Sequence, residues 1–162
     1  MKLDLAIDDV RERETQLATL LRTVGERHAT EPDLYHLGQM LARSCADHVT
    51  RLQPFARRYG ATADGAPVDG GPGALETLRR KGSELMRHSE PAGLLLLRDL
   101  RELYLAAQDS ELAWVMLLQA ARAARDPDLV EVATACHEEA DGCGRWLRTR
   151  LKEAAPQVLA SG

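Results

Sequence analysis

Two stretches of this chain repeat apolar residues in alternating steps of three and four, and a glutamate interrupts each repeat. The first repeat runs through Leu3, Ile7, Val10, Leu17, Leu21 and Val24, with Glu14 in its middle. The second runs through Leu97, Leu100, Tyr104, Ala107, Trp114, Leu118 and Ala121, with Glu111 in its middle. Such steps place each set on one helix face, so both carboxylates are expected to point toward a core. A buried carboxylate is costly unless it is paired, protonated or bound to a metal.

Helix start and stop signals divide the chain into four long helices. We expect helices over about residues 3–28, 32–59, 91–125 and 127–155. Gly60 is a stop signal for the second helix, Asp126 and Pro127 start the fourth, and Pro156 should end it. Leu and Ala are frequent while aromatic residues make up only 4%, which favours helices over strands.

The spacing of these helices predicts one all-α domain, a four-helix bundle. The 162 residues are enough for a single core. Short turns join the helices into two hairpins, and residues 60–90 connect the hairpins, with a short extra helix expected over 74–88. This long connection could cross back along the bundle, or it could decorate a loop of an up-down-up-down bundle.

The polar residues on the four core faces are expected to share one level of this bundle. Glu14 and His48 each lie about 24–27 Å from the first hairpin turn, and Glu111 and Glu139 lie about 20–22 Å from the second. Cysteines follow the same stripes one turn away, although Ser44 and Ala140 could replace Cys45 and Glu139 on the inner faces. The candidate site residues are Glu14, Cys45, His48, Glu111, Cys136 and Glu139.

This order of residues resembles that of ferritin-like di-iron proteins. Those proteins carry one Glu on each of two helices and Glu-x-x-His on each of the other two. The corresponding positions here are Glu14, Cys45-x-x-His48, Glu111 and Cys136-x-x-Glu139. The resemblance implies a ferritin-like fold with one long crossover, and a link to metal or oxidative stress. Because cysteines replace both bridging glutamates, it implies a degenerate site rather than a full di-iron oxidase, and no enzymatic activity is predicted.

Two interpretations of the carboxylates follow. In the first, Glu14, His48, Glu111 and Glu139 hold one transition-metal ion, and mixed nitrogen and oxygen ligands suit iron, manganese or zinc. In the second, the protein is free of metal, and Glu14 or Glu111 pairs with His48 or with an arginine. A buried ion pair explains an interrupted apolar stripe equally well.

A third interpretation uses the cysteines. Cys45, Cys136 and Cys143, with His48 or His137, could form a thiolate site for copper(I) or zinc. Cys136 and Cys143 share a helix face but lie about 10 Å apart along it, which is too far for one ion to bridge. Buried cysteines also serve as small apolar side chains in cores.

Composition limits the partners. The formal net charge of −4 provides no basic surface for nucleic acid, and no apolar run approaches the ~20 residues of a membrane span. Asp4, Asp8 and Asp9 interrupt the first ten residues, which argues against a signal peptide. An odd number of cysteines favours a reducing, cytoplasmic location. Leu94–Leu97 is apolar on every side of its helix, so we expect a homodimer, or a contact with the crossover helix or a protein partner.

Overall fold

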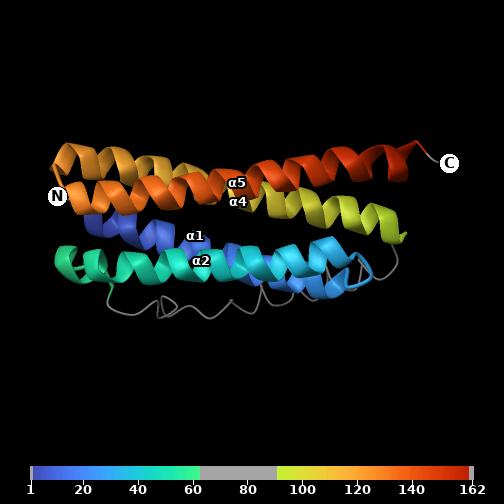
Figure 1. Ribbon diagram of the computed structural model, residues 1–162, viewed down its shortest axis with the longest axis horizontal. Coiled ribbons are helices and arrows are strands. Elements are labelled where there is room, and N and C mark those ends of the chain that lie inside the picture. Colours follow the sequence, from blue (N-terminus) through green and yellow to red (C-terminus); the bar gives the residue numbers. More distant parts are fainter. Residues whose placement is uncertain (1, 63–90, 161–162) are drawn as a thin grey trace, which may run out of the picture.

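The computed structural model describes residues 2–62 and 91–160, and nearly all of them are helical. Within these ranges the helices are α1 (Leu3–Arg27), α2 (Pro32–Tyr59), α4 (Ala92–Ala124) and α5 (Pro127–Leu159), as Figure 1 shows. The described residues contain no strand. The all-α prediction is therefore confirmed, whereas the short helix expected over 74–88 lies outside the described residues.

The signals at the helix ends act as expected. Gly60 closes α2 with φ of 73°, in the left-handed region that favours glycine. Asp126 precedes α5, and its carboxylate accepts a hydrogen bond from the Leu129 amide at 3.1 Å. These signals place both ends of α1, α2 and α4 and the start of α5 within one residue of their predicted positions.

The end of α5 was predicted wrongly. The helix continues through Pro156 to Leu159 instead of stopping near residue 155. Proline removes one helix hydrogen bond, but the final turn packs on the start of α4: a Cβ added at Gly93 would lie 3.0 Å from Val158 Cγ2. The Ala160 amide also donates to the Pro156 carbonyl at 3.1 Å. Tertiary packing therefore retains a turn that the local sequence disfavours.

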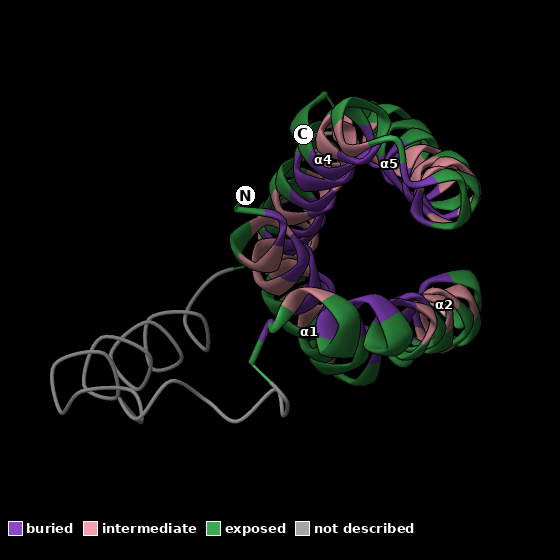
Figure 2. Ribbon diagram, turned by 90° about the vertical axis from the view of Figure 1, so that its left-hand side faces the viewer, coloured by how far each residue is buried: buried purple, intermediate pink, exposed green. Residues whose placement is uncertain are grey.

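The four helices form a ring that is loosely closed on one side. α1 packs along α2 and α4, and α4 packs along α5, whereas α2 and α5 touch only sparsely. Figure 2 shows the helices end-on, with buried residues facing inward and with α2 and α5 opposite each other across the open side. None of the described helices has the length and apolar character needed to cross a lipid bilayer.

Two apolar clusters form the core and fix the helix directions. One cluster unites the start of α1, the end of α2, the second half of α4 and the first half of α5. The other cluster unites the opposite halves of the same helices. Because the ends of α2 and α4 meet in one cluster, these two helices run in the same direction, opposite to α1 and α5 (Figure 1). This order differs from an up-down-up-down bundle.

Candidate functional site

Glu14 lies in α1 between the two apolar clusters and is almost completely buried, with 1% of its surface exposed. One carboxylate oxygen, Oε1, accepts hydrogen bonds from Ser110 Oγ at 2.8 Å and from Trp114 Nε1 at 2.6 Å. The other oxygen, Oε2, lies 3.2 Å from Nδ1 of His48. Both oxygens therefore have partners, which offsets the cost of burying the charge.

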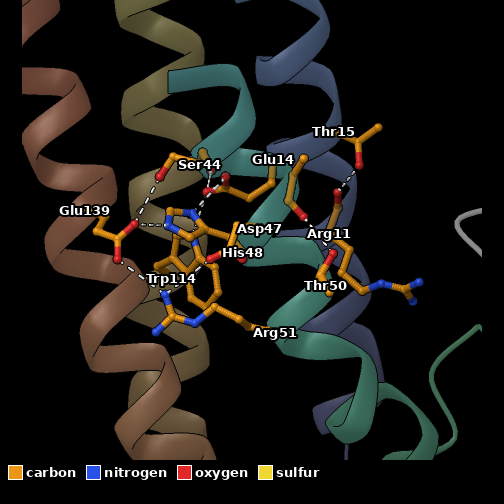
Figure 3. Close-up of polar contacts among 12 residues, drawn as sticks. Arg11, Glu14, Thr15, Ser44, Asp47, His48, Thr50, Arg51, Trp114 and Glu139 are labelled. Carbon is orange, nitrogen blue, oxygen red and sulfur yellow. Dashed lines mark hydrogen bonds and ion pairs between the residues drawn. The ribbon is translucent and has the colours of Figure 1, made fainter. Parts of the chain in front are cut away.

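His48 of α2 uses both ring nitrogens, and each faces a different carboxylate (Figure 3). Nδ1 faces Glu14 on α1, and Nε2 lies 2.9 Å from Oε2 of Glu139 on α5. The indole of Trp114 meets the imidazole edge-on, with ring centroids 5.7 Å apart. An imidazole whose two nitrogens both face carboxylates can donate to both only when it is protonated.

Glu139 connects this buried pair to the surface. Its side chain is 48% exposed and also accepts a hydrogen bond from Ser44 Oγ at 3.0 Å. Arg51 NH1 lies 3.3 Å from its second oxygen. Carboxylates and basic side chains therefore alternate outward from Glu14 through His48 and Glu139 to Arg51, across the open side between α2 and α5 (Figure 3).

The pKa values of these groups follow from this alternation. Burial alone would raise the pKa of Glu14, but the hydrogen bonds and charge of His48, with Trp114 and Ser110, outweigh it and lower the pKa. Burial alone would lower the pKa of His48, but Glu14 and Glu139 together raise it. The His48 hydrogen bond lowers the pKa of Glu139. Each charged form is thus stabilised by its neighbours.

Glu111 does not join this site. Its side chain is 22% exposed, and it pairs with Nε2 of His137 on α5 at 2.6 Å. The expectation that both interrupting carboxylates point into the core therefore holds for Glu14 and is wrong for Glu111. The reason is the rotation of α4 about its own axis. This rotation buries Ser110 completely and leaves Glu111 partly exposed beside the buried face. In place of a carboxylate, α4 contributes the hydrogen-bond donors Ser110 and Trp114.

The predicted cysteines divide between two environments. Cys45 and Cys143 line a small pocket between α2 and α5, together with Glu14 and His48, whereas Cys136 lies in the first apolar cluster and is fully buried. All three are free thiols. Burial raises the pKa of each thiol, to about 12 for Cys136 and Cys143 and further for Cys45. Protonated thiols are poor nucleophiles and poor metal ligands.

The described ranges contain no group of three or more His, Cys, Asp or Glu side chains arranged to hold a metal ion. The two carboxylates that contact His48 lie at different ring nitrogens. Glu14 and Glu139 therefore meet at one imidazole, whereas Glu111 pairs with His137 instead.

The sequence also left two contributors unidentified. Arg51 and Ser110 gave no signal on their own, but a buried Trp114 needs an acceptor for its indole N–H. The acceptor that α1 provides is Glu14.

A second buried charge lies near the end of α1. Asp99 of α4 is completely buried, and its Oδ2 is 2.7 Å from Arg27 NH1 and 2.8 Å from His28 Nε2. These contacts tie the start of α4 to the end of α1, and they lower the Asp99 pKa despite its burial. We regard this cluster as a structural link between helices.

Comparison of the chain with protein-family models, with curated proteins and with solved structures finds no match.

Proposed function

We propose that this chain is a ferritin-like bundle that formerly held a metal, that protonated His48 now supplies the central positive charge, and that the protein acts by binding a partner rather than by catalysis. The parallel course of α2 and α4 supports this, because bundles with one crossover share it. Glu14 on α1 and His48 on α2 also keep the type of side chain that such sites carry near mid-bundle, whereas Glu139 on α5 stands where such sites carry a histidine.

The observation that carries the proposal is the double engagement of His48. A metal ligand must present an unprotonated nitrogen, whereas His48 Nδ1 and Nε2 both face carboxylates whose negative charge raises the histidine pKa. A protonated imidazole between two carboxylates provides the positive charge that a metal ion would otherwise supply. It neutralises the buried Glu14 without any bound ion.

The donor set also argues against a dinuclear metal centre. Bridging carboxylates hold two metal ions together at ferritin-like sites. In this chain Cys45 and Cys136 occupy the positions that correspond to those carboxylates. Cys136 lies among apolar side chains, and α4 supplies the N–H and O–H donors of Trp114 and Ser110. A catalytic thiol is likewise disfavoured, since burial raises the pKa of all three cysteines.

Elemental analysis tests this proposal. Protein purified without chelators should contain far less than one equivalent of iron, manganese, zinc or copper. Calorimetric titration with Zn²⁺, Mn²⁺ and anaerobic Fe²⁺ should then show no saturable metal binding that depends on His48. The unsubstituted protein and His48→Gln should therefore give the same titration. One equivalent of metal, lost in His48→Gln and retained in Glu111→Gln, would overturn the proposal.

A second candidate function, binding of a single metal ion, is favoured by the pocket between α2 and α5. Cys45 and Cys143 line it beside the facing atoms of Glu14 and His48. Glu139 at Nε2 would then be the outer carboxylate that often orients a metal-bound histidine. Binding there must displace protons from His48 and a thiol. Proton release on adding Co²⁺, with a thiolate absorption band that Cys45→Ser abolishes, would support this second function.

A further inference from the structure

The outward side of α4 carries large apolar side chains that no described part of the chain covers. Leu105, Leu112 and Met116 are 55%, 54% and 52% exposed. Steps of seven and four residues place them on one face of the helix. We call this surface the outer α4 face and define it by Arg101, Leu105, Asp109, Leu112 and Met116. Large exposed apolar groups that gather on one helix face are typical of an interaction site.

We propose that the outer α4 face is the interface of a two-fold symmetric dimer of this chain, with α4 antiparallel to its copy. In this dimer, a second copy of the chain is the partner in the binding role proposed above. The inference therefore rests on that role, but it does not depend on how the charge of Glu14 is neutralised.

The sequence of the face favours a second copy as the occupant. An isologous interface must be complementary to itself, so each position needs a suitable residue at its symmetry-related position. Around an axis between Gln108 and Asp109, Leu105 lies opposite the partner subunit's Leu112, and Leu112 lies opposite the partner subunit's Leu105. Arg101 lies opposite the partner subunit's Met116, where its aliphatic stem can cover the thioether while its charge stays in water.

The charges permit this pairing. Asp109 is the acidic group nearest the axis, and it already forms an ion pair with Arg13 of α1. Glu111, two residues after Asp109, pairs with His137. Two copies can therefore approach without opposing unpaired carboxylates, which would otherwise cost several kcal/mol.

The area indicates a weak dimer. The exposed strip of α4 from Leu94 to Ala123 is about 44 Å long and 10–12 Å wide, or about 500 Å² per copy. That is below the about 800 Å² per partner of a standard stable interface. We therefore expect a reversible dimer that forms in the micromolar range of concentration.

Sedimentation velocity of the full chain tests the dimer. The mass should rise with concentration from 17.8 kDa toward twice that value between low and high micromolar protein. Leu112→Glu should weaken association at least about tenfold, since it buries a charge at the symmetric contact. Met40→Glu is the matched control, because Met40 on α2 is 54% exposed. Circular dichroism establishes that both variants are folded.

Cysteine cross-linking tests the position of the axis independently of any stability change. With diamide as the oxidant, Asp109→Cys should form a disulfide with its own copy, because residue 109 lies next to the axis. Leu94→Cys, about 22 Å from the axis, should not. The natural cysteines are buried, which keeps the background low.

Several outcomes would overturn the dimer. One is a monomeric mass at every concentration, and another is equal weakening by Met40→Glu and Leu112→Glu. A monomer whose unfolding free energy falls in Leu112→Glu would show instead that the chain covers this face itself. None of these results bears on metal content, so failure of the dimer is distinguishable from failure of the metal-free site.

Discussion

His48 Nδ1 lies 3.2 Å from the Glu14 Oε2 atom, and both side chains are almost fully buried. This contact joins α1 to α2 in the middle of the bundle, between the two apolar clusters. Removing one partner of a buried pair leaves an uncompensated charge, which costs more than the pair itself contributes. The stability of the bundle should therefore depend on this pair far more than on the ion pairs at its surface.

Glu14→Gln should lower the free energy of unfolding by about 3–5 kcal/mol, because His48 then loses the buried half of its counter-charge. Urea denaturation at pH 6 measures the change. Glu111→Gln is the matched control: it breaks the partly exposed pair with His137 and should cost less than about 1 kcal/mol. Equal losses in the two variants would mean that the Glu14 pair has no special weight.

The free energy of unfolding should depend on pH, because folding shifts the pKa values of Glu14, Glu139 and His48. Glu14 and Glu139 have pKa values lowered from 4.5, so their contribution is present above pH 4.5 and is lost as the pH falls through the folded-state values. His48 has a pKa raised from 6.5, so its contribution is complete below pH 6.5 and is lost as the pH rises through the folded-state value.

The three groups together therefore stabilise the fold most between about pH 4.5 and 6.5. Urea midpoints measured from pH 5 to pH 9 should fall on the alkaline side. In His48→Gln that decline should flatten, because the titrating imidazole is gone. An unchanged decline in the variant would assign the pH dependence to other groups.

Trp114→Phe isolates one hydrogen bond to the buried carboxylate. Phenylalanine retains most of the ring but lacks the indole N–H that donates to Glu14 Oε1 at 2.6 Å. We expect a loss of about 1–3 kcal/mol for a hydrogen bond to a buried charge. Thermal unfolding followed by circular dichroism measures it. Trp146→Phe is a suitable control because Trp146 is only partly buried, and a larger loss there would contradict the assignment.

Substitution by alanine should change stability in opposite directions at Gly142 and Gly38. A Cβ at Gly142 meets nothing within 4 Å, so Gly142→Ala should stabilise α5 by about 0.5–1 kcal/mol. A Cβ at Gly38 would lie 3.2 Å from the Leu21 carbonyl oxygen, where α1 and α2 approach closely. Gly38→Ala should therefore give no such gain and should lower the urea midpoint. Similar stabilisation by both substitutions would mean that α1 and α2 can separate at no cost.

The helices could be predicted from the sequence because their ends carry strong local signals. Gly60 and the pair Asp126–Pro127 each act through backbone geometry and one hydrogen bond, which do not depend on the rest of the fold. The end of α5 could not be predicted, because it depends on the packing of Val158 against Gly93. Those two residues are distant in sequence.

The site could be predicted only in part, because the rotation of α4 was ambiguous. Apolar residues stand on both sides of its expected stripe, as with Leu103 beside Tyr104 and Leu117 beside Leu118. A rotation of one residue then decides whether Ser110 or Glu111 faces the core. In α1 the residues of the predicted stripe, from Leu3 to Val24, are all buried, so the burial of Glu14 was predicted correctly. Its contact with His48 is one of the pairings that the second interpretation of the carboxylates named.

Nitrogen-15 chemical shifts of the His48 ring at pH 7 test the central claim most directly. Imidazole nitrogens report protonation separately, and His48→Gln identifies the signals. An internal cation predicts that both nitrogens carry protons at pH 7, and that the pKa measured by titration lies above 6.5. A neutral ring with one bare nitrogen at pH 7, or a nitrogen whose shift changes when stoichiometric Zn²⁺ is added, would contradict it.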